Sequence, residues 1–179
     1  MTLKKTNLHG CFLINYGTHI DSRGTFKKIY TLEGLNSSGI NTNFQEQYFS
    51  ISDKNVIRGM HFQVPDYAQD KLVTCLTGKV LDVIIDLRKN YGTYGQFESS
   101  IFDSSKDCSS IFLPAGIAHG FLSLEENSGM LYSTSTEYIP RCDKGISWNS
   151  FGFEWPCSKP IISERDSKHE PFNLFKTPF

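Results

Sequence analysis

The most informative stretch of the chain reads Val56-Ile57-Arg58-Gly59-Met60-His61-Phe62-Gln63. Its β-branched and aromatic residues favour a strand. Strand alternation would turn its side chains to two faces: Arg58, Met60 and Phe62 to one, and Ile57, His61 and Gln63 to the other. A histidine in so strongly β a stretch is expected to be at least partly buried. Such an imidazole either makes a structural hydrogen bond or has a chemical role, and the segment alone does not distinguish the two.

The sequence on both sides of this stretch is almost entirely β in character. Besides 56–63, runs rich in Val, Ile, Phe, Tyr and Thr predict strands at 26–30, 46–52, 71–76, 80–87, 97–102, 109–113, 118–124 and 130–138. Many short strands separated by turn residues predict a β-sandwich or barrel, of which the jelly roll is one form. No low-complexity linker or repeat interrupts the pattern, so we expect a single domain over residues 1–179.

Smaller features complete the predicted fold. The segment Lys79–Leu87 has only Asp82 and Asp86 as acids, which predicts a strand buried on much of both faces. Residues 76–79, Leu-Thr-Gly-Lys, are a plausible tight hairpin before it. Short helical turns are expected near Leu32–Leu35 and in the tail after Asp166.

Composition excludes several classes of protein. The 179 residues carry a formal net charge of −1, without the basic excess of a general nucleic-acid binder. No apolar run reaches the length of a membrane span, and the N-terminus lacks the apolar core of a signal peptide. The five cysteines are odd in number and form no CxxC pair, which argues against a disulfide framework or a zinc site. We therefore expect a cytoplasmic protein that binds neither nucleic acid nor membrane.

Four further segments carry residue types that could do chemistry. Leu113–Phe121 presents His119 after a Pro-Gly turn, and Gln69–Val73 contains Lys71. Tyr138-Ile139-Pro140 ends a predicted strand, and Ser163-Glu164-Arg165-Asp166 lies near the C-terminus. Taken singly, each is explained as well by packing or by an exposed turn. Their order along the chain is more informative than any one of them.

Together these segments resemble the dTDP-4-dehydrorhamnose 3,5-epimerase family over nearly the whole chain. The matching stretches are Asp21-Ser22-Arg23-Gly24-Thr25-Phe26, RGMHFQ at 58–63, QDKLV at 69–73, TGKVLDV with DLR at 77–88, PAGIAHGF at 114–121, Tyr138-Ile139-Pro140 and SERD at 163–166. One such match would be weak, whereas this many in the same order are not expected by chance. The chain is therefore identified as similar to that family.

The resemblance implies both a fold and an assembly. The fold would be an all-β cupin jelly roll, a double-stranded β-helix barrel with a short, mostly irregular or helical C-terminal segment. The assembly would be a homodimer whose N-terminal segments cross between subunits. The reaction would be epimerisation at C3, C5 or both of a nucleotide-diphosphate 4-keto-6-deoxy sugar, dTDP- or GDP-linked, in cell-surface polysaccharide biosynthesis.

The resemblance also implies roles for individual residues. His61 and Asp166 would form the catalytic dyad, with Tyr138 as proton donor and Lys71 beside the keto oxygen of the substrate. The residues implied to bind substrate are Arg23, Phe26, Glu46, Tyr48, Arg58, Gln63 and His119.

This set of residues suits the chemistry of a 4-keto sugar. The ketone acidifies the C–H bonds at C3 and C5, so the enzyme needs a base, an acid and a donor at the ketone oxygen. A histidine has a pKa close to working pH, and a carboxylate such as Asp166 would hold its tautomer. Because the substrate's own ketone takes up the electrons, no cofactor is expected.

Metal chemistry is the main rival explanation for histidines in a cupin. Metal-binding cupins usually present His-x-His with a Glu in the first motif and another His in the second. Here the first motif contains only His61 and the second only His119. This falls short of the usual three or four ligands, so no catalytic metal is predicted.

The departures from the family pattern leave the exact substrate open. Glu46-Gln47-Tyr48 and Lys28 differ from the usual residues near the sugar and the base. The open alternatives are an epimerase that acts at C3 only or C5 only on a GDP-4-keto-heptose, and a cupin 3,4-ketoisomerase. A non-catalytic sugar-binding or metal-binding cupin is a further class. Lys71, Tyr138 and the SERD tail argue for the epimerase.

Overall fold

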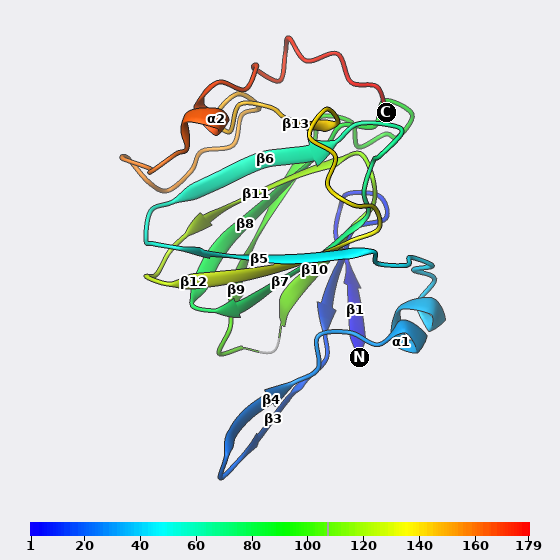
Figure 1. Ribbon diagram of the computed structural model, residues 1–179, viewed down its shortest axis with the longest axis vertical. Helices are drawn as coiled ribbons and strands as arrows, with labels where there is room; N and C mark the ends of the chain where they lie inside the picture. The colour runs from blue at the N-terminus through cyan, green and yellow to red at the C-terminus, as the bar shows by residue number, and fades with distance from the viewer. Residues whose placement is uncertain (107) are drawn as a thin grey trace.

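Two facing antiparallel sheets make up most of the protein (Figure 1). The computed structural model describes residues 1–106 and 108–179. The first sheet runs β1 (Thr2–Lys5), β2 (Phe12–Asn15), β10 (Cys108–Leu113), β7 (Lys71–Thr77), β12 (Ser128–Thr134), β5 (Glu46–Ser52). The second runs β13 (Asp143–Gly145), β6 (Ile57–Gln63), β11 (Ile117–Ser123), β8 (Lys79–Asp86), β9 (Phe97–Asp103). This is the predicted cupin jelly roll.

The apolar core lies between the sheets and continues behind the second one. Between the sheets, residues such as Val73 of β7, Ile84 of β8 and Phe121 of β11 are at most 2% exposed. On the outer face of the second sheet, Met60 and Ile85 are buried under the C-terminal tail, which supplies Phe175 and other aromatic residues. Full burial of each such side chain stabilises the fold by about 1.5–3 kcal/mol. Strand β8 of the second sheet is therefore buried on both faces, which confirms the prediction for 79–87.

The hairpin predicted at residues 76–79 is wrong. Strand β7 pairs with β10 and β12, whereas β8 pairs with β11 and β9, so the chain passes from one sheet to the other at this turn. Gly78 has φ of +71°, and a Cβ there would lie 2.6 Å from Ser128 Oγ. A tight turn was predicted correctly, but both neighbours of β8 are strands of its own sheet. The turn is a corner of the barrel.

Most predicted strands are present, with two clear errors at their ends. The strand predicted at 26–30 is β4 (Gly24–Lys27), which pairs with β3 (Thr18–Asp21) in a separate hairpin that extends away from the barrel (Figure 1). The strand predicted at 130–138 ends at Thr134, so Tyr138 lies in a loop rather than in the ladder. The short strands β1, β2, β3 and β13 were not predicted, because four residues or fewer give little alternation.

The described chain also contains two short helices, outside the sheets. Helix α1 (Leu32–Ser37) begins after Thr31, whose side chain accepts a hydrogen bond from the Gly34 amide. Helix α2 (Glu164–Ser167) begins two residues before Asp166, so the helical turn expected after Asp166 in fact contains it. Among the described helices, none has the length and apolarity needed to cross a membrane.

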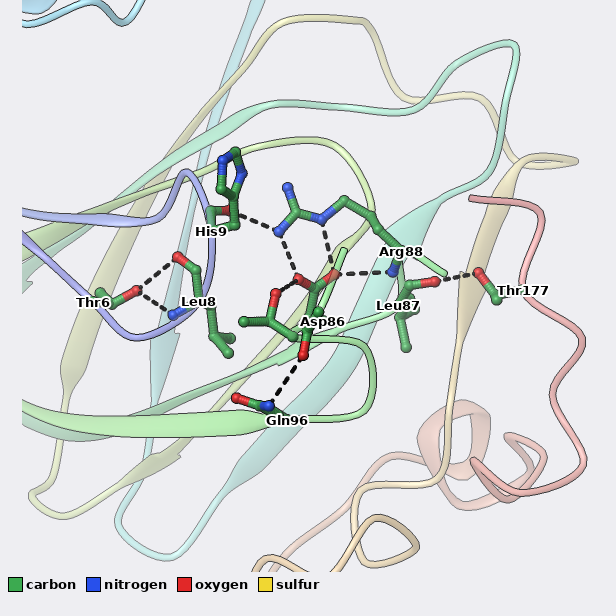
Figure 2. A network of polar contacts seen from close by, with 10 residues as sticks. Thr6, Leu8, His9, Asp86, Leu87, Arg88, Gln96 and Thr177 are labelled. Atoms are coloured by element: carbon green, nitrogen blue, oxygen red, sulfur yellow. Dashed lines mark hydrogen bonds and ion pairs between the residues drawn. The ribbon is translucent and has the colours of Figure 1, made fainter. Parts of the chain in front are cut away.

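A buried ion pair ties both chain termini to the end of β8 (Figure 2). Arg88 donates from Nε and Nη2 to the two carboxylate oxygens of Asp86, at 2.8 and 2.7 Å, and from Nη2 to the carbonyl of His9 at 2.7 Å. Thr177, near the C-terminus, donates to the Leu87 carbonyl at 2.6 Å. Burial alone would raise the pKa of Asp86, but the hydrogen bonds and charge of Arg88 hold it below its usual value. The DLR motif is thus a structural clamp.

We predict that Arg88→Met destabilises the protein strongly. The change leaves the Asp86 carboxylate buried and without its charge partner, which costs about 3–5 kcal/mol in comparable sites. Equilibrium denaturant unfolding measures the effect. Lys168→Met is the control, because it breaks an ion pair with Glu164 whose side chains are 71% and 83% exposed. Its effect should be below about 1 kcal/mol, and equal losses in both variants would contradict the clamp.

Candidate active site

One pocket gathers most of the predicted site residues. Strands of both sheets and two loops form it. Its lining residues are Glu46, Tyr48, Ser50, Arg58, His61, Phe62, Gln63, Gln69, Lys71, His119, Tyr132, Tyr138, Asp143 and Arg165. The labels in Figure 1 show that the strands contributing them belong to both layers. The barrel therefore collects residues spread over more than a hundred positions of sequence.

Strand β6 does not alternate as predicted. His61 pairs with His119, and Arg58 pairs with Phe121. Between these two pairs β6 advances by three residues and β11 by two, so β6 contains a β-bulge. As a result Arg58 and His61 both line the pocket, whereas the prediction placed them on opposite faces. Gly59 has φ of +148°, and a Cβ there would lie 2.6 Å from the Cα of Gly120. Glycine is needed at both positions for this close approach.

His61 and Asp166 form the predicted pair. Their Nε2 and Oδ1 atoms lie 2.8 Å apart, and the side chains are 28% and 5% exposed. The second oxygen of Asp166 accepts a hydrogen bond from the Gly59 amide at 3.1 Å. The Asp166 amide in turn donates to Ser163 Oγ at 3.0 Å, which caps helix α2. The carboxylate is held from both sides before any substrate arrives.

The electrostatics of this pair favour a neutral imidazole beside an ionised carboxylate. Burial lowers the pKa of His61 from 6.5, although the hydrogen bond and charge of Asp166 act in the opposite direction. Burial alone would raise the pKa of Asp166, but the neighbouring imidazoles of His169 and His61 hold it well below its usual range. We assign the imidazole proton to Nε2, where it is donated to Asp166. That assignment leaves the lone pair on Nδ1, so His61 can act as a base.

Lys71 is a buried cation next to His61. It is 5% exposed, and its Nζ donates to the His61 carbonyl at 3.2 Å. Burial lowers its pKa to about 8, while the charge of Asp143 acts to raise it. The side chain is therefore still largely an ammonium at neutral pH, and it lines the pocket.

A second imidazole–carboxylate pair faces the first across the ladder. His119 Nε2 lies 2.7 Å from Asp82 Oδ2, and both side chains are less than 5% exposed. His119 lines the pocket, as the resemblance implied. Asp82 was visible in the sequence as part of the 77–88 motif, but nothing local indicated that it pairs with His119. The barrel brings the two together because β8 and β11 are neighbours.

Tyr138 stands at the edge of the pocket on a loop that other predicted residues hold in place. It is 50% exposed. Its amide donates to Glu46 Oε2 at 2.5 Å, and the neighbouring Ile139 amide donates to Gln63 Oε1 at 2.6 Å. The Gln63 amide nitrogen donates to the carbonyls of Tyr67 and Glu137. Glu46 and Gln63 thus position the Tyr138 loop, a role that the sequence did not indicate.

Tyr48 and Arg58 also line the pocket. The Tyr48 ring stacks on Tyr132 with centroids 4.8 Å apart. Arg58 donates from Nε to Ser52 Oγ at 3.0 Å, which orients the guanidinium along the pocket wall. The pocket also contains Arg165, whose Nη1 lies 2.8 Å from Asp143. Sequence reasoning missed this pair, although Arg165 is part of the SERD motif.

Arg23 and Phe26 are not near this pocket in their own chain. They lie on the β3–β4 hairpin, which extends away from the barrel (Figure 1). The Arg23 side chain is 88% exposed and pairs with Asp21, and Phe26 is 62% exposed. The single chain therefore assembles all the predicted site residues except these two.

Three side chains of the site have a set of atoms that could hold a metal ion. Single donor atoms of His61, Asp166 and His169 all lie within 4.8 Å of one another. His169 was not singled out in the sequence, because one histidine in an irregular tail carries no local signal. His169 adds a third potential metal-ligating atom to His61 and Asp166. It lies outside both cupin motifs.

Comparisons with known proteins agree on one family. The family model described as dTDP-4-dehydrorhamnose 3,5-epimerase matches residues 5–173. The dTDP-4-dehydrorhamnose 3,5-epimerase of Methanothermobacter thermautotrophicus is 35% identical over 172 residues, 93% of this chain and 92% of that protein. The Bacillus anthracis enzyme, solved with TDP and PPi bound, has a TM-score of 0.91 at 31% identity, over 95% of this chain and 98% of that one. The Legionella pneumophila enzyme, in complex with dTDP-4-keto-L-rhamnose, has a TM-score of 0.92 at 28% identity, over 98% and 94% of the chains.

We predict that Asp166→Asn lowers the pKa of His61 further. The carboxylate stabilises the imidazolium through a hydrogen bond and through charge, and both contributions are lost or weakened in the amide. Lys71→Met is a control of opposite sign, because the Lys71 charge lowers the pKa of His61 and its removal should raise it. A pH titration of the His61 Cε1–H resonance by NMR measures both. A rise in the Asp166→Asn variant would contradict the assigned pairing.

Proposed function

The chain belongs to the dTDP-4-dehydrorhamnose 3,5-epimerase family and is a carbohydrate epimerase, and we propose that His61 is the base that abstracts a proton from its keto-sugar substrate. The observation that carries this proposal is the 2.8 Å contact of His61 Nε2 with the buried Asp166 carboxylate. It orients the ring and leaves Nδ1 to accept a proton. Asp166 then stabilises the imidazolium that forms.

The enolate formed by this step needs a counter-charge at the ketone oxygen, and we assign that role to Lys71. Its ammonium is already desolvated and is anchored on the His61 carbonyl, so it stands beside the base. A preorganised donor of this kind is worth about 3 kcal/mol in known enzymes. Its pKa of about 8 keeps it charged at neutral pH, where His61 is neutral. The two residues are therefore in the required protonation states together.

Return of the proton on the opposite face is assigned to Tyr138. A phenol is a neutral donor at pH 7, so it delivers a proton without competing as a base. Tyr138 lies at the pocket edge on the loop that Glu46 and Gln63 hold. The exposure of its ring lets the phenol be reprotonated from solvent between turnovers. This gives His61 and Tyr138 separate roles in removing and returning the proton.

For the substrate we propose a dTDP-linked 4-keto-6-deoxy hexose, inverted at both C3 and C5. Arg58 lines the pocket and offers a planar fork of donors, which suits the oxygens of a diphosphate. The stacked Tyr48 and Tyr132 rings give the same pocket a flat apolar wall for a base or sugar ring.

For the location we propose the cytoplasm, as expected from the sequence. Four cysteines are free thiols, which fits a reducing compartment: Cys11, Cys75, Cys142 and Cys157.

We also propose a homodimer in which the β3–β4 hairpin carries Arg23 and Phe26 to the pocket of the partner. Three features support it. The hairpin exposes Ile20 and Phe26 at 77% and 62%, and edge strand β5 exposes Phe49 and Ile51 at 68% and 57%. Large apolar side chains as exposed as these are typical of an interface between chains. Arg23, which the family resemblance places at the substrate, lies far from the pocket of its own chain and at the exposed end of this hairpin.

The proton-transfer roles predict separate defects for the base and the donor. In D₂O, wild-type enzyme should incorporate deuterium and form epimer together. His61→Asn should lose both by at least about a hundredfold, the usual contribution of a general base. Tyr138→Phe should still exchange the C3 or C5 proton but form less epimer, because the enolate is reprotonated on its original face. NMR of the sugar carbons, one by one, separates the two outcomes.

Tyr94→Phe, outside the pocket, is the matched control and should behave as wild type. If exchange and epimerisation fall in equal proportion in Tyr138→Phe, the donor role is wrong. The same spectra identify the substrate. Turnover of a GDP-linked heptose in place of the dTDP-hexose would replace the proposed substrate. Deuterium at one carbon only would replace the double epimerisation by a single one. Migration of the ketone to C3 would replace epimerisation by ketoisomerisation.

The crossed dimer predicts complementation between two impaired chains. A mixture of Arg23→Ala and His61→Asn chains should regain activity, because mixed dimers contain one site with an intact His61 from one chain and an intact Arg23 from the other. Random exchange in an equal mixture should restore about a quarter of the wild-type sites. The control mixture combines Arg141→Ala with His61→Asn chains and should be no more active than the sum of its parts. An Arg23→Ala mixture no more active than the sum of its parts would argue against crossing.

A further inference from the structure

His169 is held against the catalytic pair by the backbone of the C-terminal tail. The adjacent Glu170 forms a parallel bridge with Ile146, and its carbonyl accepts a hydrogen bond from the Ser147 amide at 2.8 Å. The His169 ring lies against Gly145, where a Cβ would come within 2.4 Å of Nε2. Gly145 pairs with His61 in the ladder of β13 and β6. The glycine therefore leaves the space that this ring fills beside His61.

The Nε2 atom of His169 is buried without a hydrogen-bond partner in residues 1–106 and 108–179. It lies 3.6 Å from Asp166 Oδ1, beyond hydrogen-bond distance, and that same oxygen contacts His61 Nε2 at 2.8 Å. The two rings meet edge to face with centroids 5.8 Å apart. A buried polar atom left unpaired is unfavourable and calls for a partner.

We propose that His61, Asp166 and His169 bind a divalent ion of the zinc class, and that the bound ion switches the epimerase off. Two imidazoles and a carboxylate are a ligand set that zinc accepts, with bonds near 2.0–2.2 Å. In a tetrahedral complex such ligand atoms lie about 3.3 Å apart. The observed separations of 2.8 and 3.6 Å bracket that value, and all three atoms lie within 4.8 Å of one another. Small side-chain shifts complete the site.

An entry path to the dyad exists beside the substrate pocket. A second cavity, distinct from the substrate pocket, is lined by Val56, Ile57, Arg58, His61, Ile161, Ile162, Ser163, Arg165 and Asp166. Arg58, His61 and Arg165 border both cavities. An ion can therefore reach the dyad from this second cavity, and water can take its fourth position.

The inhibition follows from the imidazole tautomer, and it rests on the proposed role of His61 as base. In the active form the proton is on Nε2 and the lone pair on Nδ1. An ion bound at Nε2 takes the lone pair there, so the single imidazole proton moves to Nδ1. Nδ1 is then a donor and can no longer accept the proton of the sugar. Because the ion occupies Nε2 and not the Nδ1 side of the ring, kcat should fall with little change in KM.

The charges around the site set its strength. Arg165 Nε lies 3.7 Å from Asp166 Oδ1, and the ammonium of Lys71 is nearby behind the His61 carbonyl. Both oppose a second cation, whereas the ionised Asp166 attracts it. Arg165→Gln should therefore bind the ion more tightly than wild type. Arg165 is 51% exposed, so this substitution is expected to leave the fold intact.

Binding is tested with Co²⁺ alone, without substrate. Wild-type protein should take one Co²⁺ per chain and give the intense visible bands of a four-coordinate ion. His169→Phe, which keeps a ring against Gly145, should lose at least tenfold in affinity, and Arg165→Gln should gain. His9→Gln is the control, because His9 lies near the Arg88 clamp and away from the dyad. Absence of the bands, or an equal affinity in His169→Phe, would overturn the site.

Inhibition is tested by titrating Zn²⁺ into the epimerase assay. The zinc concentration for half inhibition should rise at least tenfold in His169→Phe, scored against that variant's own zinc-free rate, and stay unchanged in His9→Gln. Zinc that binds at the dyad but leaves kcat unaltered would overturn the switch and also the role of His61 as base. Loss of zinc binding with a normal His61→Asn defect would overturn the site alone.

Discussion

The buried carboxylate of Asp166 is the contact on which the arrangement of the site depends. It accepts hydrogen bonds from the Gly59 amide in the bulge of β6 and from His61 on the same strand, while Ser163 caps its own helix. One residue of the C-terminal tail thereby fixes the imidazole proposed as the base and the bulge of the strand that carries it. Because a buried charge is costly without such partners, the tail cannot leave β6 without a large loss of stability.

The two faces of the second sheet have different surroundings. Its outer face is covered by the aromatic tail, whereas the edge of its inner face, near His61 and His119, opens into the pocket. The paired carboxylates Asp82 and Asp166 each hold one imidazole, so both rings have defined orientations.

The same close packing explains why the site is open to both catalysis and inhibition. An oxygen that accepts one imidazole hydrogen bond has room for a second imidazole, and His169 occupies that place without being hydrogen-bonded. A neutral imidazole held by a carboxylate is also a good metal ligand, because each role needs a lone pair on one ring nitrogen. Strand β6 supplies His61, whereas the C-terminal tail supplies both Asp166 and His169.

The sequence by itself determined the strand pattern, the double burial of β8 and the family, since alternation and ordered motifs are properties of neighbouring residues. It also identified His61, Asp166, Lys71, His119 and Tyr138, which the barrel brings to one pocket or its edge. Only the tertiary structure decided that β7 and β8 lie in different sheets, that Arg58 and His61 share a face, and that Arg23 points away. It alone paired Asp82 with His119 and set His169 beside Asp166. These outcomes depend on which strands meet and on a bulge allowed by Gly59 and Gly120, and local periodicity carries no record of either.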